Sequence, residues 1–203
     1  IICYAQLLQI QGHVTEEKRI QFAAVIADEG QWLKNMSDRM QDYICIGVIN
    51  EYNRQEVNIK QLMQEVCEKV QSIYQKHNIG LKLQSEDFSV RVEPDLFERM
   101  LYNYLDNARK ASAENEEVWL SAYQTEDGYT IEIADHGIGM AQEEIGKIED
   151  PFYMIDKARG RKTEGVGLGM AIAGKIAAAH HGEVRIESMP KEGTTIRIHF
   201  SED

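Results

Sequence analysis

Residues 135–139, Asp-His-Gly-Ile-Gly, and residues 165–169, Gly-Val-Gly-Leu-Gly, are two glycine-rich motifs that carry much of the information in this chain. Upstream of them, residues 103–110 read Asn-Tyr-Leu-Asp-Asn-Ala-Arg-Lys. An aspartate at the end of a strand can accept a hydrogen bond from the exocyclic amino group of adenine. The glycines beside Asp135 allow the backbone to approach a flat base and to take φ > 0 without steric cost. A glycine pair alone is usually a turn, so the first motif indicates a site for an adenine ring only together with the other two segments.

The second motif opens a stretch with helical patterning. At a helix N-terminus the first N–H groups have no partner within the helix, and the helix dipole adds to their preference for phosphate. Asn103 and Asn107 lie four residues apart, with Lys110 three residues further on, so they share one side of a helix. Amide oxygens one turn apart can hold a magnesium ion, although such amides are often simply solvated. The three segments together predict a nucleotide site.

These motifs and their order resemble the ATP-binding domain of sensor histidine kinases, within the superfamily that includes gyrase, Hsp90 and MutL. Residues 103–110 are similar to its N box and residues 135–139 to its G1 box. Residues 151–153 are similar to its F box, and residues 165–169 to its G2 box. The resemblance covers roughly residues 54–203 and implies an ATP site that uses Mg²⁺.

The resemblance also implies roles for single residues. Asp135 binds the adenine amino group, while Asn107, supported by Asn103, holds Mg²⁺. Asn103 and Lys110 form the catalytic group, with Lys110 on the phosphates. The remaining expected nucleotide contacts are Gly137, Gly139, Phe152, Gly165, Gly167, Leu168, Gly169 and Thr195. Thr194 and Thr195 are explained nearly as well by the preference of threonine for strands.

Asn103 departs from the ATP-hydrolysing members of the superfamily, where a glutamate orients the attacking water. Because an amide cannot act as a general base, the site is expected to hold ATP while hydrolysing it poorly. Asp106 is acidic but is expected to face elsewhere. Residues 141–164 resemble a lid over the phosphates, with Phe152 as its anchor. In this lid, Glu164 stands where a glycine is common, and the basic residues are Lys157, Arg159, Arg161 and Lys162.

Composition narrows the class of protein. A net charge of −12 over 203 residues argues against a nucleic-acid surface, which needs a basic face. Three widely spaced cysteines fit neither a zinc motif nor a disulfide framework, so we expect a reducing, cytoplasmic setting. This setting includes the cytosolic portion of a membrane-bound receptor. The chain starts without methionine, which we interpret as part of a longer protein.

The first part of the chain is helical in pattern. Thr15 followed by two glutamates predicts a helix start. Beyond it, small or apolar residues recur at steps of three and four, widened by Trp32, Met36 and Tyr43: Ala23, Ile26, Gly30, Leu33, Ser37, Met40 and Ile44. One and a half helices cannot complete a bundle, so we expect a homodimer, as in the hairpins of histidine kinases. The alternative is packing on the C-terminal domain of the same chain.

We therefore predict three segments. Residues 1–46 form a partial helical dimerisation and phosphotransfer hairpin, residues 47–54 a linker, and residues 55–203 the ATP-binding catalytic domain. Alternating apolar residues after residue 55 predict strands, and amphipathic stretches predict helices, including one over residues 167–181. The expected fold class is α+β, a two-layer α/β sandwich of the Bergerat type preceded by the helical hairpin.

The histidine that would accept the phosphoryl group is not found. Histidine kinases carry it in a His-Glu/Asp-x-x-x-Pro pattern, which none of the six histidines matches. His13 fits a hairpin tip, and His180 and His181 fit helix-end charge. By register, the expected histidine would precede Ile2, so either it lies outside this chain or the parent protein has lost it.

Three functions remain open. The first is the catalytic part of a histidine kinase, which transfers the γ-phosphoryl group of ATP to a bundle histidine for relay to an aspartate of a response regulator. The second is a kinase-inactive scaffold that dimerises and senses nucleotide. The third, a serine kinase of the anti-sigma-factor type, is the weakest alternative, because such proteins lack the preceding long helix.

Overall fold

The structure is a computed structural model that describes residues 1–9, 14–46, 53–73, 80–113, 116–155 and 166–201. It divides into two compact units, Ile1–Ile44 and Cys45–Asp203. No helix in these described ranges is long and apolar enough to cross a membrane.

The first unit consists of α1 (Ile2–Gln9) and α2 (Glu16–Cys45, whose last residue falls in the second unit). At the start of α2, Thr15 Oγ1 accepts a hydrogen bond from Lys18 N at 3.4 Å, as the N-cap prediction requires. The rings of Tyr4 and Phe22 lie 5.1 Å apart and join the two helices. Within the residues that the structure describes, neither helix buries a side chain. The predicted apolar stripe of α2 is therefore largely exposed.

The second unit contains two sheets. Strands β1 (Gln55–Asn58) and β3 (Ser89–Val92) form an antiparallel pair. The other described strands form a five-stranded sheet in the order β2-β4-β5-β7-β6. Their bounds are Gly80–Ser85 (β2), Glu117–Thr125 (β4), Gly128–Asp135 (β5), Gly182–Met189 (β6) and Gly193–Ser201 (β7). Strand β2 runs parallel to β4, and the remaining neighbours are antiparallel.

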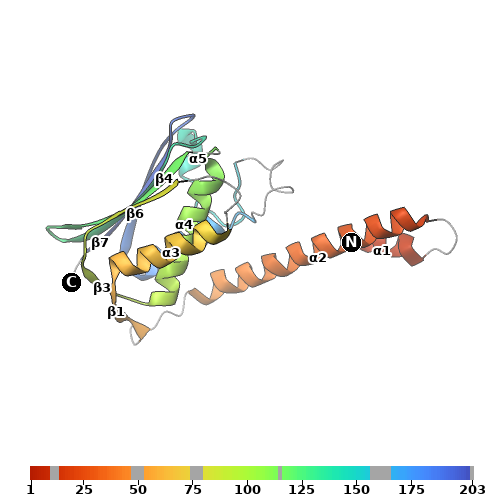
Figure 1. The fold of residues 1–203 in the computed structure, drawn as a ribbon, viewed down its shortest axis with the longest axis horizontal. Helices are drawn as coiled ribbons and strands as arrows, with labels where there is room; N and C mark the ends of the chain where they lie inside the picture. Colours follow the sequence, from red (N-terminus) through yellow and green to blue (C-terminus); the bar gives the residue numbers. More distant parts are fainter. Residues whose placement is uncertain (10–13, 47–52, 74–79, 114–115, 156–165, 202–203) are drawn as a thin grey trace. The chain divides into compact units, whose positions relative to one another are not determined.

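Helices cover one face of this sheet, as Figure 1 shows for α3 and α4. The helices of the unit are α3 (Ile59–Ile73), α4 (Pro94–Ala111), the short α5 (Gln142–Ile145) and α6 (Gly169–Ala179). Helix α4 starts sharply because Pro94 stands in its first turn and Glu93 accepts a hydrogen bond from Leu96 N. The core between the layers includes Phe97, Leu101, Leu105, Leu120, Ile131, Ile133 and Ile172. The predicted α+β sandwich is confirmed.

One local expectation needs adjustment. The helix predicted over residues 167–181 begins at Gly169 and ends at Ala179. Ile73, the last residue of α3, is 55% exposed. Hairpin turns before Gly128 and before Gly193 connect β4 to β5 and β6 to β7.

Candidate functional site

Helix α4 presents the amide face that the sequence predicts. Asn103 is only 8% exposed, and its Nδ2 donates a hydrogen bond to the carbonyl of Arg99 at 2.8 Å. This bond fixes the amide, so that Oδ1 turns toward the start of α6. Asn107 lies one turn further along and is partly exposed. The two side chains thus differ in accessibility.

Lys110 is already paired. Its Nζ donates to Asp106 Oδ2 at 2.7 Å, across one helical turn. Asp106 is buried, whereas the Lys110 side chain keeps 30% of its surface exposed. Asp106 was expected to face elsewhere, but it lies beside Lys110 and holds its ammonium group in place.

Asp135, at the end of β5, is a buried carboxylate. It is 7% exposed, and its Oδ1 accepts a hydrogen bond from Gly137 N at 2.8 Å. Burial raises the pKa of Asp135 above its ordinary value, while hydrogen bonds from the backbone of Gly137 and Thr194 oppose that rise. Loss of water is the larger effect. A carboxylate in this setting gains from any further N–H donor that reaches it.

The glycines of the first motif are required by the close approach of other chain segments. A Cβ on Gly137 would lie 2.3 Å from the carbonyl oxygen of Ala111, at the end of α4. Gly139 has φ 59°, and a Cβ there would lie 1.9 Å from the oxygen of Met189. Between them, Ile138 N donates to Ala111 O at 3.0 Å. The motif is therefore held against both α4 and the β6–β7 turn.

Thr194, not Thr195, stands beside the aspartate. Thr194 pairs with Asp135 across β5 and β7, and it is 8% exposed. Its hydroxyl lies 2.9 Å from Ser188 Oγ, which also accepts a hydrogen bond from Met140 N. Since successive strand residues face opposite sides, Thr195 lies on the face away from Asp135. The structure does not bring Thr195 to this group and puts Thr194 in its place.

The second motif is held by the predicted F box. Phe152 N donates to Gly167 O at 2.8 Å, and Gly167 has φ 70°. Phe152 itself has φ 67°, and its side chain is 46% exposed, so its backbone makes this anchor. Leu168 is fully buried and precedes Gly169, the first residue of α6. Gly165, Glu164 and the four basic lid residues lie outside the described residues.

Helix α4 joins the two motifs. Its C-terminal Ala111 accepts the hydrogen bond from Ile138, beside Asp135. About two turns before Ala111, Asn103 Oδ1 lies 3.3 Å from where a Cβ on Gly169 would stand. Asn103 and Ala111 are about 12 Å apart along the helix axis. The buried carboxylate and the N-terminus of α6 therefore flank one stretch of α4, an arrangement suited to an elongated ligand with a base at one end and phosphates at the other.

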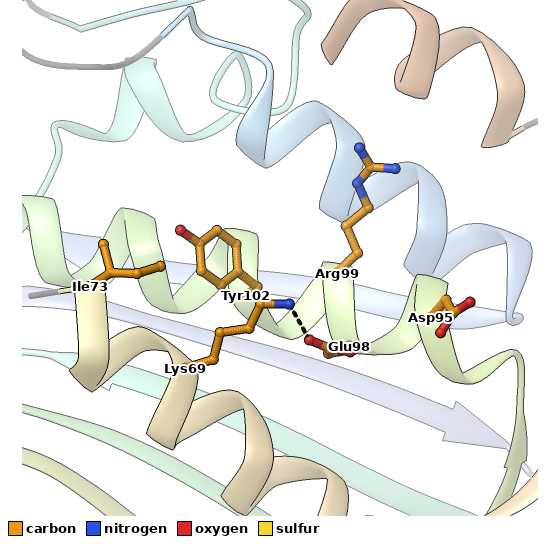
Figure 2. Close-up of a pocket in the computed structure, with 6 residues that line it drawn as sticks. All are labelled: Lys69, Ile73, Asp95, Glu98, Arg99 and Tyr102. Atoms are coloured by element: carbon orange, nitrogen blue, oxygen red, sulfur yellow. Dashed lines mark hydrogen bonds and ion pairs between the residues drawn. The ribbon is translucent and has the colours of Figure 1, made fainter. Parts of the chain in front are cut away.

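A separate pocket of about 400 Å³ lies between α3 and α4 (Figure 2). Asp95, Glu98, Arg99 and Tyr102 line it from α4, and Lys69 and Ile73 line it from α3. The Lys69–Glu98 ion pair, 2.6 Å long, crosses it. Three of its α4 residues, Asp95, Glu98 and Tyr102, lie on a different stripe of the helix from Asn103, Asn107 and Lys110, and Arg99 lies at the border between the two stripes. The pocket is therefore not part of the predicted nucleotide site.

Asn103 and Asn107 could bind a metal ion only together with oxygens from a bound ligand and water. Among the described residues, no group of three or more histidine, cysteine, aspartate or glutamate side chains could hold a metal ion. Asn103 and Asn107 offer neutral amide oxygens, and Mg²⁺ commonly combines few protein oxygens with phosphate oxygens and water. The donor set fits Mg²⁺ that arrives with a nucleotide.

Comparison with known proteins adds a family. The model of the histidine kinase-, DNA gyrase B-, and HSP90-like ATPase family matches residues 92–203. The signal transduction histidine-protein kinase ArlS of Staphylococcus aureus is 32% identical over 157 residues, which are 76% of this chain and 35% of ArlS. The chain thus spans about a third of the length of this curated relative.

Solved structures of histidine kinases share the fold. The mycobacterial sensor histidine kinase MprB is 24% identical, with a TM-score of 0.64 over 73% of this chain and 97% of the solved MprB chain. The Acinetobacter baumannii histidine kinase AdeS is 15% identical, with a TM-score of 0.72 over 98% of this chain and 92% of the solved AdeS chain. Full-length ShkA in complex with AMPPNP is 22% identical, with a TM-score of 0.75 over 96% of this chain and 42% of ShkA.

Proposed function

Because the chain belongs to the histidine kinase-, DNA gyrase B- and HSP90-like ATPase family, we propose that residues 55–203 bind ATP as the catalytic part of a sensor histidine kinase. The proposal rests on one arrangement along α4. The buried Asp135 lies beside Ala111 at the C-terminal end of this helix, and Asn103, about two turns earlier, meets the N-terminus of α6. The ShkA structure, which has this fold and was solved with AMPPNP, supports the same reading.

Asp135 would select the base. Its carboxylate accepts a hydrogen bond from the adenine amino group, and guanine, which carries a carbonyl at that position, would leave it unpaired. Thr194 and Ser188 brace the strand end beside it. Gly137 and Gly139 let the first motif pack against the backbone of Ala111 and Met189, which holds the chain beside Asp135 in place.

The phosphates would lie toward α6. The N–H groups at the start of α6 and the ammonium group of Lys110 offer positive charge to them. Asn107 and Asn103 would supply amide oxygens to Mg²⁺, which neutralises phosphate charge when it is bound. Since Asn103 cannot remove a proton from water, this arrangement favours transfer to another nucleophile over hydrolysis.

The acceptor and the partners follow from the family. We propose that the phosphoryl group goes to a histidine of a helical bundle and then to an aspartate of a response regulator. The bundle would form when the α2 stripe of one chain packs on that of a second copy, since the stripe is exposed in a single chain. His13 lies outside the described residues, and we propose that it is not the histidine that accepts the phosphoryl group.

The adenine assignment is tested by calorimetry with ATP and Mg²⁺. Asp135→Ala should weaken binding by about 1–3 kcal/mol or more, because the base amino group loses its buried acceptor. Asp127→Ala is a matched control, since Asp127 lies in the turn before the opposite end of the same strand and is exposed. Equal ATP affinity in wild type and Asp135→Ala, with both folded, would refute the assignment.

A second experiment separates a kinase from a nucleotide-sensing scaffold. The chain is mixed with labelled ATP and with a fragment of the parent protein that includes the residues before Ile1. Acid-labile, base-stable label on that fragment is the expected result for a histidine kinase. Binding of ATP without any such label would favour the scaffold.

A further inference from the structure

His180 is a buried histidine with both ring nitrogens engaged. It follows α6 directly and is 7% exposed. Its Nε2 lies 3.2 Å from Glu93 N, which can only donate, so Nε2 accepts and carries no proton. Its Nδ1 lies 2.9 Å from Ile176 O and therefore donates. The geometry thus fixes the neutral imidazole and its tautomer, and His180 is not the charged helix end that the sequence predicts.

These two hydrogen bonds link the N-terminus of α4 to the C-terminus of α6. Glu93 is the N-cap of α4, and Ile176 lies in the last turn of α6. The ring also packs edge-on against Phe97, with centroids 5.4 Å apart. A guanidinium group reaches the same place, since Arg54 Nη2 donates to Ala179 O at 3.1 Å. The end of α6 is therefore held from α4 and from the segment before β1.

Protonation of His180 would break this arrangement. An added proton on Nε2 would face the N–H of Glu93. The titratable groups that act on the ring are Arg54 from the segment before β1, Glu93 from the start of α4 and His181 from its own turn. Burial lowers the pKa of His180 most, Arg54 and His181 lower it further, and Ile176 O and Glu93 oppose them. Acid therefore works against the folded geometry at this point.

The N-terminus of α6 meets the middle of α4 at the proposed nucleotide site. Gly169 begins α6 and lies against Asn103, whereas His180 ends it and binds Glu93. The two helices are therefore antiparallel neighbours over nearly equal lengths, from residue 169 to 180 and from residue 103 back to 93. A stiff helix that shifts along its axis at one end shifts at the other, so the His180 contact sets how Asn103 meets Gly169.

We propose that neutral His180 is a positioning residue for the nucleotide site: by joining the N-terminus of α4 to the C-terminus of α6, it fixes the register at which Asn103 meets the first turn of α6. The inference rests on the proposed ATP site. Nucleotide binding then becomes sensitive to acid through His180, which does not contact the nucleotide.

The test compares wild type with His180→Gln, His180→Phe and His181→Asn. Glutamine offers a neutral acceptor for Glu93 N and a donor for Ile176 O, and it does not titrate. Phenylalanine keeps a ring but makes neither bond. His181 is the matched control because it is the adjacent histidine and exposed, and asparagine tolerates its φ of 62°.

Two measurements are made. Calorimetry gives ATP affinity from pH 8 to pH 5.5, and hydrogen exchange without nucleotide follows residues 103–110 and 168–172. At pH 8, His180→Phe should weaken ATP binding and speed exchange in both segments about tenfold, while His180→Gln and His181→Asn stay within about threefold of wild type. As the pH falls, wild type and His181→Asn should lose about tenfold more affinity than His180→Gln.

Parallel pH profiles for wild type and His180→Gln would overturn the inference, and they decide it even if His180→Phe does not fold. Unchanged exchange in both segments of a folded His180→Phe would overturn it as well. Failure of wild type to bind ATP at pH 8 would instead refute the proposed function. In that case the exchange comparison, which needs no nucleotide, still decides whether His180 sets the register of α4 and α6.

Discussion

Helices α2 and α4 both carry apolar residues at helical spacing, yet they have different surroundings. The 18 residues of α4 bury one face that includes Phe97, Leu101 and Leu105. The 30 residues of α2 bury none within the described part of the chain, and Leu33 is 49% exposed. An apolar stripe on a helix therefore predicts that another surface covers it, but not which surface. The sheet covers the stripe of α4, and we propose that a second copy of the chain covers the stripe of α2.

The largest effect should come from placing charge in the α2 stripe. Ile26→Asp with Leu33→Asp should weaken dimerisation more than a hundredfold, because an unpaired buried charge costs about 3–5 kcal/mol. Light scattering measures the change. Ala24→Asp with Gln31→Asp adds the same charge to the same helix away from the stripe and should leave the dimer intact. If the Ile26→Asp, Leu33→Asp variant remains a dimer, the interface lies elsewhere. Unchanged ATP affinity in this variant would show that ATP binding by the second unit does not depend on dimerisation through α2.

Removing one leucine from each region should give unequal losses. Leu105 is fully buried, so Leu105→Ala should lower the free energy of unfolding of the second unit by about 2–5 kcal/mol. Leu33→Ala should change that same free energy by less than about 0.5 kcal/mol. Trp119 lies in the second unit and Trp32 in the first, so urea unfolding of single-tryptophan variants follows each region by itself. Equal losses would mean that the two units unfold together.

Two glycines should respond with opposite signs. Gly139→Ala should cost about 1–2 kcal/mol or more, since φ is 59° and the new methyl group meets the oxygen of Met189. Gly30, within α2, has nothing within 4 Å of an added Cβ, and Gly30→Ala should gain about 0.5–1 kcal/mol of helix stability. Thermal unfolding followed by circular dichroism measures both changes. A loss of stability at Gly30 would indicate that the stripe is already packed closely there.

The smallest effect should come from the sheet face that carries no helices among the described residues. Arg197 donates to Glu132 and to Glu187 across strands, and its side chain is 38% exposed. Arg197→Gln should cost only about 0.2–1 kcal/mol, less at high salt, because solvent and ions screen such pairs. Urea unfolding at two salt concentrations tests this. A loss as large as that for Leu105→Ala would show that ion pairs, not burial, stabilise this unit.

Much of the fold could be predicted because the patterns in the second unit are local. Alternation along Val118, Leu120 and Ala122 depends only on neighbours in the chain, and it places the buried face of β4 correctly. The partner of β2 could not be predicted in this way. It pairs in parallel with β4, although β3 and α4 come between them in the sequence, so the pairing depends on tertiary packing.

The site shows the same division. A signal for Thr194 was present, because Ile196, Ile198 and Phe200 face the core and even-numbered residues of β7 therefore share the side of Asp135. The Lys110–Asp106 pair also lies at helical spacing and was within reach. His180 had no such signal. Its burial depends on the N-terminus of α4, some ninety residues earlier in the chain.

The three cysteines differ in exposure, and this difference has a practical consequence. Cys3 and Cys45 are exposed free thiols at the two ends of the helical region, whereas Cys67 is buried in α3. Burial raises the pKa of the Cys67 thiol to about 11, so little thiolate forms there at neutral pH, and thiolate is the form that alkylating reagents attack. A maleimide dye should therefore mark the native chain on Cys3 and Cys45 without mutagenesis. The molecule carries its own attachment points for fluorescence energy transfer between two copies.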